Sequence, residues 1–305
     1  MTWVRNLVNK FYTTPPSNWL EELRKKKSSL EVKPEIEVVS IKTSPLARIL
    51  DAEYFARRDP FINTLIDRIC KREELNKVLC CFDARVFDER VAEYSYFVDW
   101  LLDKEAGQDL LDVGCVMNNS LVSGVLQDRC KNVWLANVAF EANINVANPV
   151  FYHLTTLRDA FPNGEQFPLV TCFSTIEHIG YDNSQYGSKD PGAYTQPALE
   201  PLIESFRKLG ELTAPGGSLL ISVPYGYREA IIHPITRKIA SQIFDFEALR
   251  EGIKVLEKQG FSCNLEVMAA SENGWKAVDP ITCNAQYADG CPAAGAVAFL
   301  KVIKP

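Results

Sequence analysis

The chain has 305 residues, of which 47% are apolar and 24% charged. This length suits one large or two small domains, and the composition can bury a sizeable core, which excludes a mainly disordered or fibrous chain. The 33 Lys and Arg against 39 Asp and Glu give a net charge of −6, so we expect no nucleic-acid partner, because an acidic chain repels phosphate backbones.

The nine cysteines form no C-x-x-C pair, and only three histidines accompany them. This spacing predicts reduced thiols rather than a zinc site or a disulfide framework. No apolar run approaches the ~18 residues of a membrane span, and the first residues lack the pattern of a signal peptide. We therefore predict a cytoplasmic protein.

Residues 1–75 are predicted to form an N-terminal helical extension, with helices over 1–12 and 18–27. Apolar residues recur at helical spacing in the first of these: Trp3, Val4, Leu7, Val8 and Phe11. An amphipathic helix near the basic run at 24–27 could lie on an anionic membrane surface. We favour the alternative, in which it docks on its own protein or on a second copy of the chain in a homo-oligomer.

From residue 76 to 305, helical and strand patterns alternate. We predict strands at 109–113, 132–136, 167–173, 218–223, 262–269 and 295–302, and helices at 85–104, 120–130, 196–212 and 245–259. Such alternation predicts an α/β fold with a doubly wound, mostly parallel sheet and helices on both faces.

The segment that bears on chemistry is DVGCVMNNS at residues 112–120, which follows the first predicted strand. In a doubly wound sheet, ligands bind at the carboxyl ends of the strands, where this turn lies. Gly114 allows a sharp turn and a close approach of the backbone to a ligand. Asp112 suits a ligand that carries an ammonium group, and the G-x-G-x-x-G pattern of dinucleotide sites is missing.

This segment resembles motif I of the class I S-adenosylmethionine-dependent methyltransferases. Four further blocks fall in the order of that family: VWLANV at 133–138, LRDAFP at 157–162, PLVTCFSTIEH at 168–178 and LTAPGGSLLISVP at 212–224. The resemblance covers residues 76–305 and implies a Rossmann-like, seven-stranded sheet with S-adenosyl-L-methionine as cofactor. It also implies the residues that bind this cofactor: Asp112, Gly114, Cys115, Asn118, Asn137, Val138, Leu157, Arg158 and Ser174.

Several positions depart from the family pattern. Val116 and Asn118 stand where later glycines of motif I are usual, and Asn137 replaces the acid that binds the ribose. Asn118 tolerates a positive φ, and Asn137 can still accept one hydroxyl proton. Thr156 stands where an adenine-contacting Asp is common, so Arg158 or Asp159 takes over part of that contact. These departures leave open a binding or structural subunit without turnover.

His178 and Glu177 are the candidate catalytic residues. His178 follows the fourth predicted strand, where an imidazole can take the proton from an acceptor hydroxyl. Glu177 also fits the capping box that begins at Ser174, and the cap is the favoured reading. A magnesium ion held by Glu177, His178 and Asp182 is an alternative, but we predict no metal.

Two further groups of residues have open roles. Arg90, Glu93 and Tyr94 share a helix face that either covers the methionine end of the cofactor or forms a surface ion pair. His153 is predicted to lie in a strand, and His233 could line the acceptor pocket.

The acceptor is predicted to be a small polar molecule, such as a sugar or glycan precursor, methylated on a hydroxyl or, as the second choice, an amine. The basis is a set of polar loops that carry aromatic side chains: Tyr181, Tyr225, Tyr227 and Trp275. An α/β enzyme with another nucleotide-like ligand remains a third possibility.

Overall fold

The computed structural model describes residues 52–138, 144–147, 149–152, 157–184, 192–233, 235–289 and 291–305, and the backbone of 40–43 and 153. The helices predicted at 1–12 and 18–27, and Thr156, lie outside these residues. Within them, no helix is long and apolar enough to cross a bilayer.

Helices and strands alternate as predicted. The helical segments are α3 (Ala52–Cys70), α4 (Leu75–Leu79), η2 (Ala84–Val86), α5 (Arg90–Leu102), α6 (Ser120–Arg129), η3 (Ile176–His178), α7 (Glu200–Leu212) and α8 (Phe246–Lys258). The strands are β1 (Ser40–Thr43), β2 (Gln108–Val113), β3 (Cys130–Asn137), β4 (Pro149–His153), β5 (Phe167–Phe173), β6 (Thr213–Pro224), β7 (Glu229–Ile232), β8 (Ile239–Gln242), β9 (Ser262–Ser271), β10 (Gly274–Val278) and β11 (Ala296–Ile303).

The central sheet has the order β10-β9-β11-β6-β5-β2-β3-β4. Strands β4, β3, β2, β5 and β6 pair in parallel, whereas β11 is antiparallel to both β6 and β9. The predicted doubly wound, mostly parallel α/β sheet is therefore confirmed. It has eight strands rather than seven, because β10 turns back along β9 as an edge hairpin.

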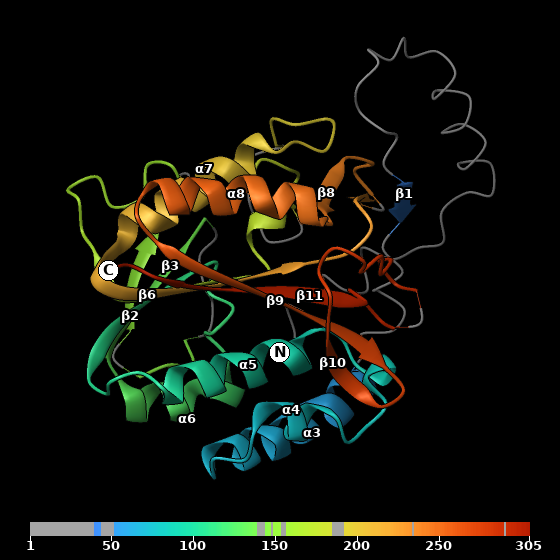
Figure 1. Cartoon of the computed structure of the whole chain (residues 1–305), viewed down its shortest axis with the longest axis horizontal. Helices are drawn as coiled ribbons and strands as arrows, with labels where there is room; N and C mark the ends of the chain where they lie inside the picture. Colours follow the sequence, from blue (N-terminus) through green and yellow to red (C-terminus); the bar gives the residue numbers. More distant parts are fainter. Residues whose placement is uncertain are drawn as a thin grey trace.

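Helices cover both faces of this sheet (Figure 1). The strands alternate in burial: Leu110 packs into one core with α3, α4, α5 and α6, and Leu111 packs into the other core with α7 and α8. Phe299 and Leu300 of β11 divide between the two cores in the same way. Alternate side chains along each strand therefore pack into opposite cores, which explains why these strands are continuous apolar runs in the sequence.

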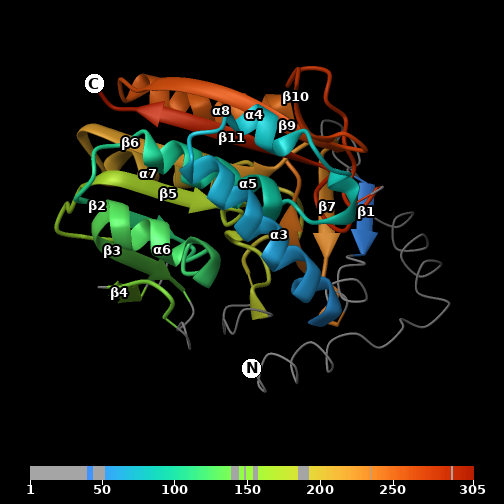
Figure 2. The same ribbon diagram turned by 90° about the horizontal axis from the view of Figure 1, so that it is seen from below.

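A second, smaller sheet has the order β1-β7-β8 and lies beside the carboxyl ends of β5 and β6 (Figure 2). Strand β1 pairs in parallel with β7, so Ser40 lies opposite Glu229. Strands β7 and β8 were not predicted from the sequence. The sheet matters for the candidate site because the backbone of β8 contacts η3, which carries two candidate site residues: His178 Nδ1 lies 2.7 Å from Ala240 O.

Some predicted boundaries are wrong. The helix predicted from residue 85 begins only at Arg90, because residues 84–86 form a separate 3₁₀ turn and Val86 is 45% exposed. The helix predicted from 196 begins at Glu200, with Pro201 in its first turn, where a missing N–H costs nothing. Helix α3 was not predicted, although Ile62, Leu65, Ile66 and Ile69 recur at helical spacing and pack against α5.

Candidate active site

The candidate site lies where the order of the strands reverses. From β2 the chain continues to β3 and β4 on one side of the sheet, and it returns to β5 and β6 on the other. The turns that follow β2 and β5 are therefore neighbours at the carboxyl edge, which is the position where doubly wound sheets bind ligands.

The two turns are in direct contact through Gly114 and Thr175. Gly114 has φ +94°, and a Cβ built on it would lie 2.0 Å from Thr175 Oγ1. The glycine was predicted to leave space for a ligand, but the space is occupied by the threonine side chain. Asn118, which would tolerate a positive φ, does not have one; the second positive φ of the turn is at Cys115, which has φ 57° and is 6% exposed.

Asp112 lies fully buried beneath this turn. Its Oδ2 accepts a hydrogen bond from Met117 N at 2.7 Å, and its Oδ1 accepts one from Thr171 Oγ1 at 3.0 Å. Asp112 therefore fixes the shape of the loop, and in this structure both oxygens have partners within the protein.

Asn118 of the motif I segment and Asn137 of the predicted ribose side hold the backbone in a similar way. Asn118 Oδ1 accepts from Asn145 N at 2.8 Å, and Asn118 O accepts from Asn145 Nδ2 at 3.0 Å. Asn137 ends β3, and its Oδ1 accepts from the backbone N–H of Val138 at 2.8 Å. Val138 is 36% exposed at the edge of the site.

Leu157 and Arg158 lie farther along the edge. Leu157 is buried in the core formed with α7 and α8. The Arg158 side chain is 72% exposed and lies 3.8 Å from Glu204 of α7. Asp159 is exposed as well, so both side chains suggested for the adenine face solvent.

Glu93 of α5 joins the carboxyl ends of two strands. Its Oε1 accepts from Ser174 Oγ at 2.6 Å and from Ser222 Oγ at 2.5 Å, and its Oε2 contacts Arg90. Glu93 is completely buried, so the surface ion pair considered for this helix face is wrong. Tyr94 OH lies 3.5 Å from Val116 O, which brings α5 over the first turn.

The capping box predicted at Ser174 is also wrong. Ser174 has φ 35°, its hydroxyl donates to Glu93, and only the short turn η3 follows, without a side-chain cap at Thr175. Glu177 consequently does not cap a helix. Its side chain is 2% exposed, and its Oε2 has no hydrogen-bond partner among the described residues.

Burial raises the pKa of Glu177 well above its ordinary value, and nearby Glu93 and Glu89 add to the shift, whereas the Glu177 backbone N–H and Arg90 oppose it. An unpaired carboxylate is costly in such surroundings, so burial favours the neutral acid over the carboxylate unless a cation accompanies this group.

The His178 ring is held in one tautomer. Its Nδ1 lies 2.7 Å from the carbonyl oxygen of Ala240, which can only accept, so Nδ1 carries the hydrogen and Nε2 has the lone pair. Burial lowers the pKa of His178 to about 4, and Arg90 adds to this effect, whereas the Ala240 contact opposes it. His178 is therefore a neutral imidazole at neutral pH, with its side chain 19% exposed.

Further acidic residues, missed in the sequence, complete the site. Asp88 is 4% exposed and pairs with Arg58 at 2.7 Å, and Glu89 Oε2 accepts from Ala294 N at 3.2 Å. Burial first, and then Asp88, raise the pKa of Glu89 to about 7. The available signal was the dense run of charges at 88–93 beside a helix whose other residues are apolar. The site thus contains more acids than bases, which suits a cationic ligand.

Asp182 and His233 have structural partners. Asp182 Oδ1 accepts from Ser184 N at 3.1 Å, and its Oδ2 accepts from Thr236 Oγ1. His233 Nδ1 accepts from the backbone N–H groups of Ile235 and Thr236 at 3.2 and 3.1 Å, so the imidazole caps a turn. Among the described residues, no three His, Cys, Asp or Glu are grouped to hold a metal ion. The backbone of His153 ends β4.

The aromatic residues proposed for the acceptor are mostly core residues. Tyr181 and Tyr225 are each 1% exposed, and Trp275 of β10 is fully buried beside α4. Tyr227 is 43% exposed, and its N–H donates to Ala285 O at 2.8 Å.

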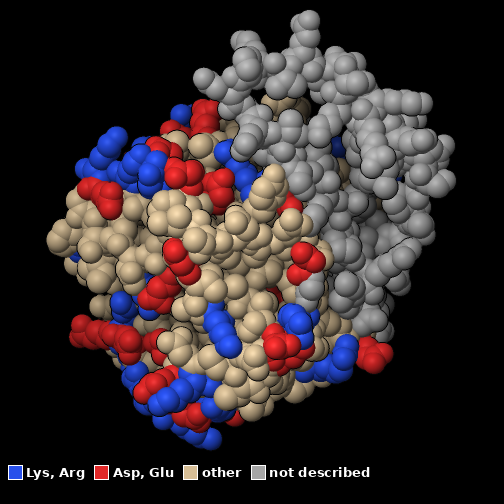
Figure 3. Space-filling view, turned by 45° about the vertical axis from the view of Figure 1, so that its right-hand side comes forward, with Lys and Arg blue, Asp and Glu red and all other residues tan. Residues whose placement is uncertain are grey.

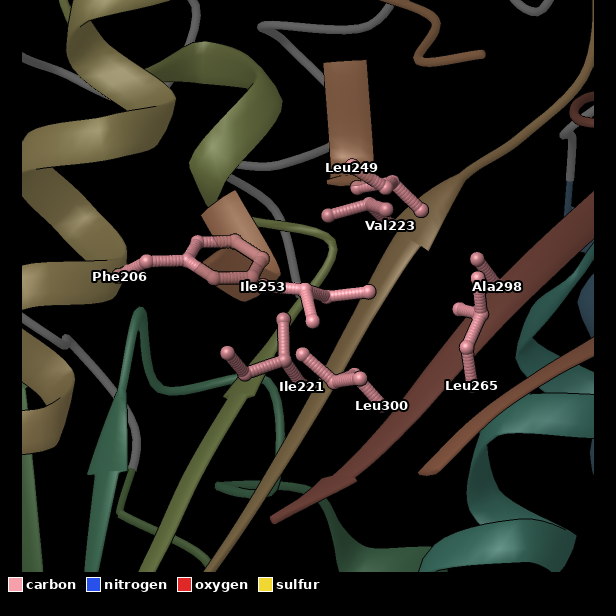
Figure 4. A pocket seen from close by; sticks show the side chains of 8 residues that line it. All are labelled: Phe206, Ile221, Val223, Leu249, Ile253, Leu265, Ala298 and Leu300. Atoms are coloured by element: carbon pink, nitrogen blue, oxygen red, sulfur yellow. The ribbon is translucent and has the colours of Figure 1, made fainter. Parts of the chain in front are cut away.

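Two other features of the molecule, an internal gap and one charged face, do not belong to this site. An apolar gap between α7, α8 and the sheet is lined only by hydrophobic side chains such as Phe206, Ile221 and Leu249 (Figure 4). It is a packing defect of the core and offers no polar group to a ligand. On the face drawn in Figure 3, basic and acidic side chains of the described residues are interspersed.

No protein-family model matches the sequence, and no curated protein matches it. The chain is similar to the solved structure of the N-methyltransferase NodS from Bradyrhizobium japonicum WM9 in complex with S-adenosyl-L-homocysteine. The identity is 13%, with 72% of this chain and 89% of that chain covered and a TM-score of 0.45.

Two other solved structures are similar at lower scores. One is an S-adenosylmethionine-dependent methyltransferase from Clostridium acetobutylicum ATCC 824, at 12% identity over 65% of this chain and 84% of that chain, with TM-score 0.38. The other is precorrin-6y C5,15-methyltransferase from Geobacter metallireducens GS-15, at 8% identity over 68% and 85%, with TM-score 0.36. By the order and directions of its strands, with the turn after β2 at the point of reversal, the chain has the class I methyltransferase fold.

Proposed function

We propose that the protein is an S-adenosyl-L-methionine-dependent methyltransferase that methylates a hydroxyl of a small polar acceptor, such as a sugar or glycan precursor. The observation that carries this proposal is the site at the reversal of strand order. There a neutral imidazole and an acid-rich cluster with a buried, unpartnered carboxyl oxygen stand beside the turn after β2.

The residues present fit the cofactor in charge and in their placement at the ends of β2, β3 and β5. Gly114 and Cys115 form the turn with positive φ, Asn137 and Val138 end β3 on the ribose side, and Ser174 lies at the end of β5. Excess carboxyl groups favour a cation and disfavour a pyrophosphate, which argues against a dinucleotide. When bound, the cofactor supplies a methyl group already activated on a sulfonium.

Asp112 and Asn118 act as positioning residues in this proposal. Asp112 holds the loop through Met117 N, and Asn118 ties it to Asn145. In this proposal the loop backbone contacts the cofactor, and both side chains determine the path of that backbone. Both are therefore required for binding even if neither side chain contacts the cofactor. Positioning is the main contribution that a protein makes to methyl transfer.

His178 is proposed as the general base. Nε2 would take the proton of the acceptor hydroxyl, so that its oxygen could accept the methyl group that the bound cofactor would supply. The imidazolium that results loses its proton to solvent. The tautomer fixed by Ala240 supports this role, because it leaves the lone pair on the nitrogen that does not face the backbone. The same chemistry serves an ammonium acceptor, which must also lose a proton.

Titration calorimetry with S-adenosyl-L-methionine and S-adenosyl-L-homocysteine tests the binding part of the proposal. We expect micromolar affinity for both ligands, and silence with both would remove the proposal. His178→Ala should then retain cofactor affinity and lose turnover on a hydroxyl acceptor by about 10²-fold or more. Tight binding without turnover on any acceptor would instead indicate a binding subunit.

A further inference from the structure

The Glu177 carboxyl is the feature of the site that the general-base role of His178 leaves unexplained. It is buried to all but 2% of its side-chain surface, and Oε2 accepts no hydrogen bond from the described residues. Buried polar atoms are rarely left without partners, and those that are require an explanation such as an unseen ligand.

The charged groups around Glu177 do not neutralise it. Arg90 and Glu93 face it from α5 and Glu89 from the N-cap of that helix. Cys172 faces it from β5, and His178 Nε2 lies 3.9 Å from Oε1 on the same turn. Arg90 contacts Glu93, and Arg58 contacts Asp88 and Asp59. Within the described residues, neither guanidinium is therefore paired with Glu177.

The acidic residues Glu89, Glu93 and Glu177 lie between the turn after β2 and the segment that leads into β11. Glu93 is bonded to Ser174 at the end of β5, and Tyr94 contacts Val116 in the turn after β2. Glu89 is bonded to Ala294, in the segment that leads into β11. A positive charge that binds beside the turn after β2 therefore lies in the field of these carboxyl groups.

We propose that Glu177 is the counter-ion of the donor's cationic sulfur, and that the donor binds in exchange for the proton of this carboxyl. The inference rests on the proposed function. Without a cation, burial keeps the carboxyl protonated, as the raised pKa of Glu177 indicates. With the sulfonium beside it, the carboxylate is favoured, and the proton leaves to solvent. One positive charge enters and one leaves, so the buried region keeps its net charge.

The exchange distinguishes donor from product. S-adenosyl-L-homocysteine has a neutral thioether at the same place, so the carboxyl keeps its proton when the product is bound. Affinity for the donor must then rise with pH relative to affinity for the product, by up to about tenfold per pH unit below the pKa of Glu177. The device favours release of the product after transfer.

Calorimetry of the full chain in two buffers of different ionisation enthalpy, such as phosphate and Tris, counts the protons. At neutral pH we expect release of about one proton with S-adenosyl-L-methionine and about none with S-adenosyl-L-homocysteine. Glu177→Gln should abolish the release and lower the donor-to-product affinity ratio by about tenfold or more. Glu211→Gln, on the exposed face of α7, is the matched control and should behave as the wild type.

Each other result has a defined meaning. Equal release with both ligands would place the exchange at their shared ammonium group and overturn the assignment to sulfur. No release with either, or unchanged release in Glu177→Gln, would also overturn it. The wild-type measurement alone can overturn the exchange, so the proposal remains falsifiable even if Glu177→Gln fails to fold. Failure of both ligands to bind would instead refute the proposed function.

Discussion

Thr175 occupies the place that a side chain on Gly114 would need: the Cβ position of the glycine lies 2.0 Å from Thr175 Oγ1 and 2.7 Å from its Cγ2. This contact joins the turns after β2 and β5, and so it fixes the two edges between which the donor is proposed to lie.

Gly114→Ala should therefore destabilise the protein for two reasons, the positive φ and the collision with Thr175. Gly107 has φ +82° and nothing within 4 Å of its Cβ position, so Gly107→Ala isolates the first reason. We expect a loss of about 1 kcal/mol in the unfolding free energy for Gly107→Ala and about 3 kcal/mol or more for Gly114→Ala. Equal losses in urea denaturation would contradict the contact.

Glu93 is predicted to be the most sensitive buried polar residue of the site. Glu93→Ala would remove the acceptor of two serine hydroxyls and leave Arg90 without its partner, which should cost about 3 kcal/mol or more. Ser222→Ala removes one of these hydrogen bonds and should cost about 1 kcal/mol. Denaturation of both variants measures the difference. A loss below that of Ser222→Ala would show that the network contributes little.

The His178 ring should remain neutral through the physiological pH range. Because burial lowers its pKa to about 4, the neutral form dominates above that pH, and the proposed base is available without loss as the pH falls towards 6. In a proton NMR titration of the three histidines, the signal absent from His178→Gln should not shift above about pH 5. A midpoint near the ordinary value of 6.5 would refute the buried environment.

Glu89 should make the protein less stable as the pH rises. Its pKa in the folded state is raised to about 7 from 4.5, so between these values the native state binds more protons than the unfolded state. The unfolding free energy therefore falls with pH in this window, by at most about 1.4 kcal/mol per pH unit. Glu89→Gln should remove this slope and gain stability relative to the wild type from pH 4.5 to 7. A constant difference between the two proteins across the window would contradict the shift.

Residues 1–28 are predicted to be dispensable for cofactor binding, because the site is built from α5 and the ends of β2, β5 and β6. Deletion of these residues should leave the affinity for S-adenosyl-L-homocysteine within about twofold of the wild type, which is under 1 kcal/mol. Liposome sedimentation of the two proteins separates the membrane alternative from docking. Loss of cofactor binding would show that the extension belongs to the site.

The central sheet could be predicted from the sequence because its strands are covered on both faces. The strand predicted at 167–173 is confirmed without change as β5, and the helix predicted at 245–259 is confirmed with Asp245 as its N-cap. The short strands β7, β8 and β10 could not be predicted, because they have no long apolar run and depend on pairing with distant segments.

The environment of the candidate site was harder to predict. Ser174 and Glu177 have the spacing of a capping box, but the Ser174 hydroxyl donates to Glu93, which is 81 residues away in sequence. This tertiary hydrogen bond replaces the local one, and the chain forms a single 3₁₀ turn. Glu93 itself reads as a surface charge in a helical pattern, and only the packing of α5 across the strand ends shows that it is buried.

A crystal structure with S-adenosyl-L-homocysteine would show whether the ligand lies beside the turn after β2. We expect density for the ligand at the carboxyl ends of β2 and β5, along the backbone of Gly114 and Cys115, with the sulfur facing the carboxyl of Glu177. Density for the ligand at another edge of the sheet, or side chains of the protein filling this place at saturating ligand, would contradict this expectation.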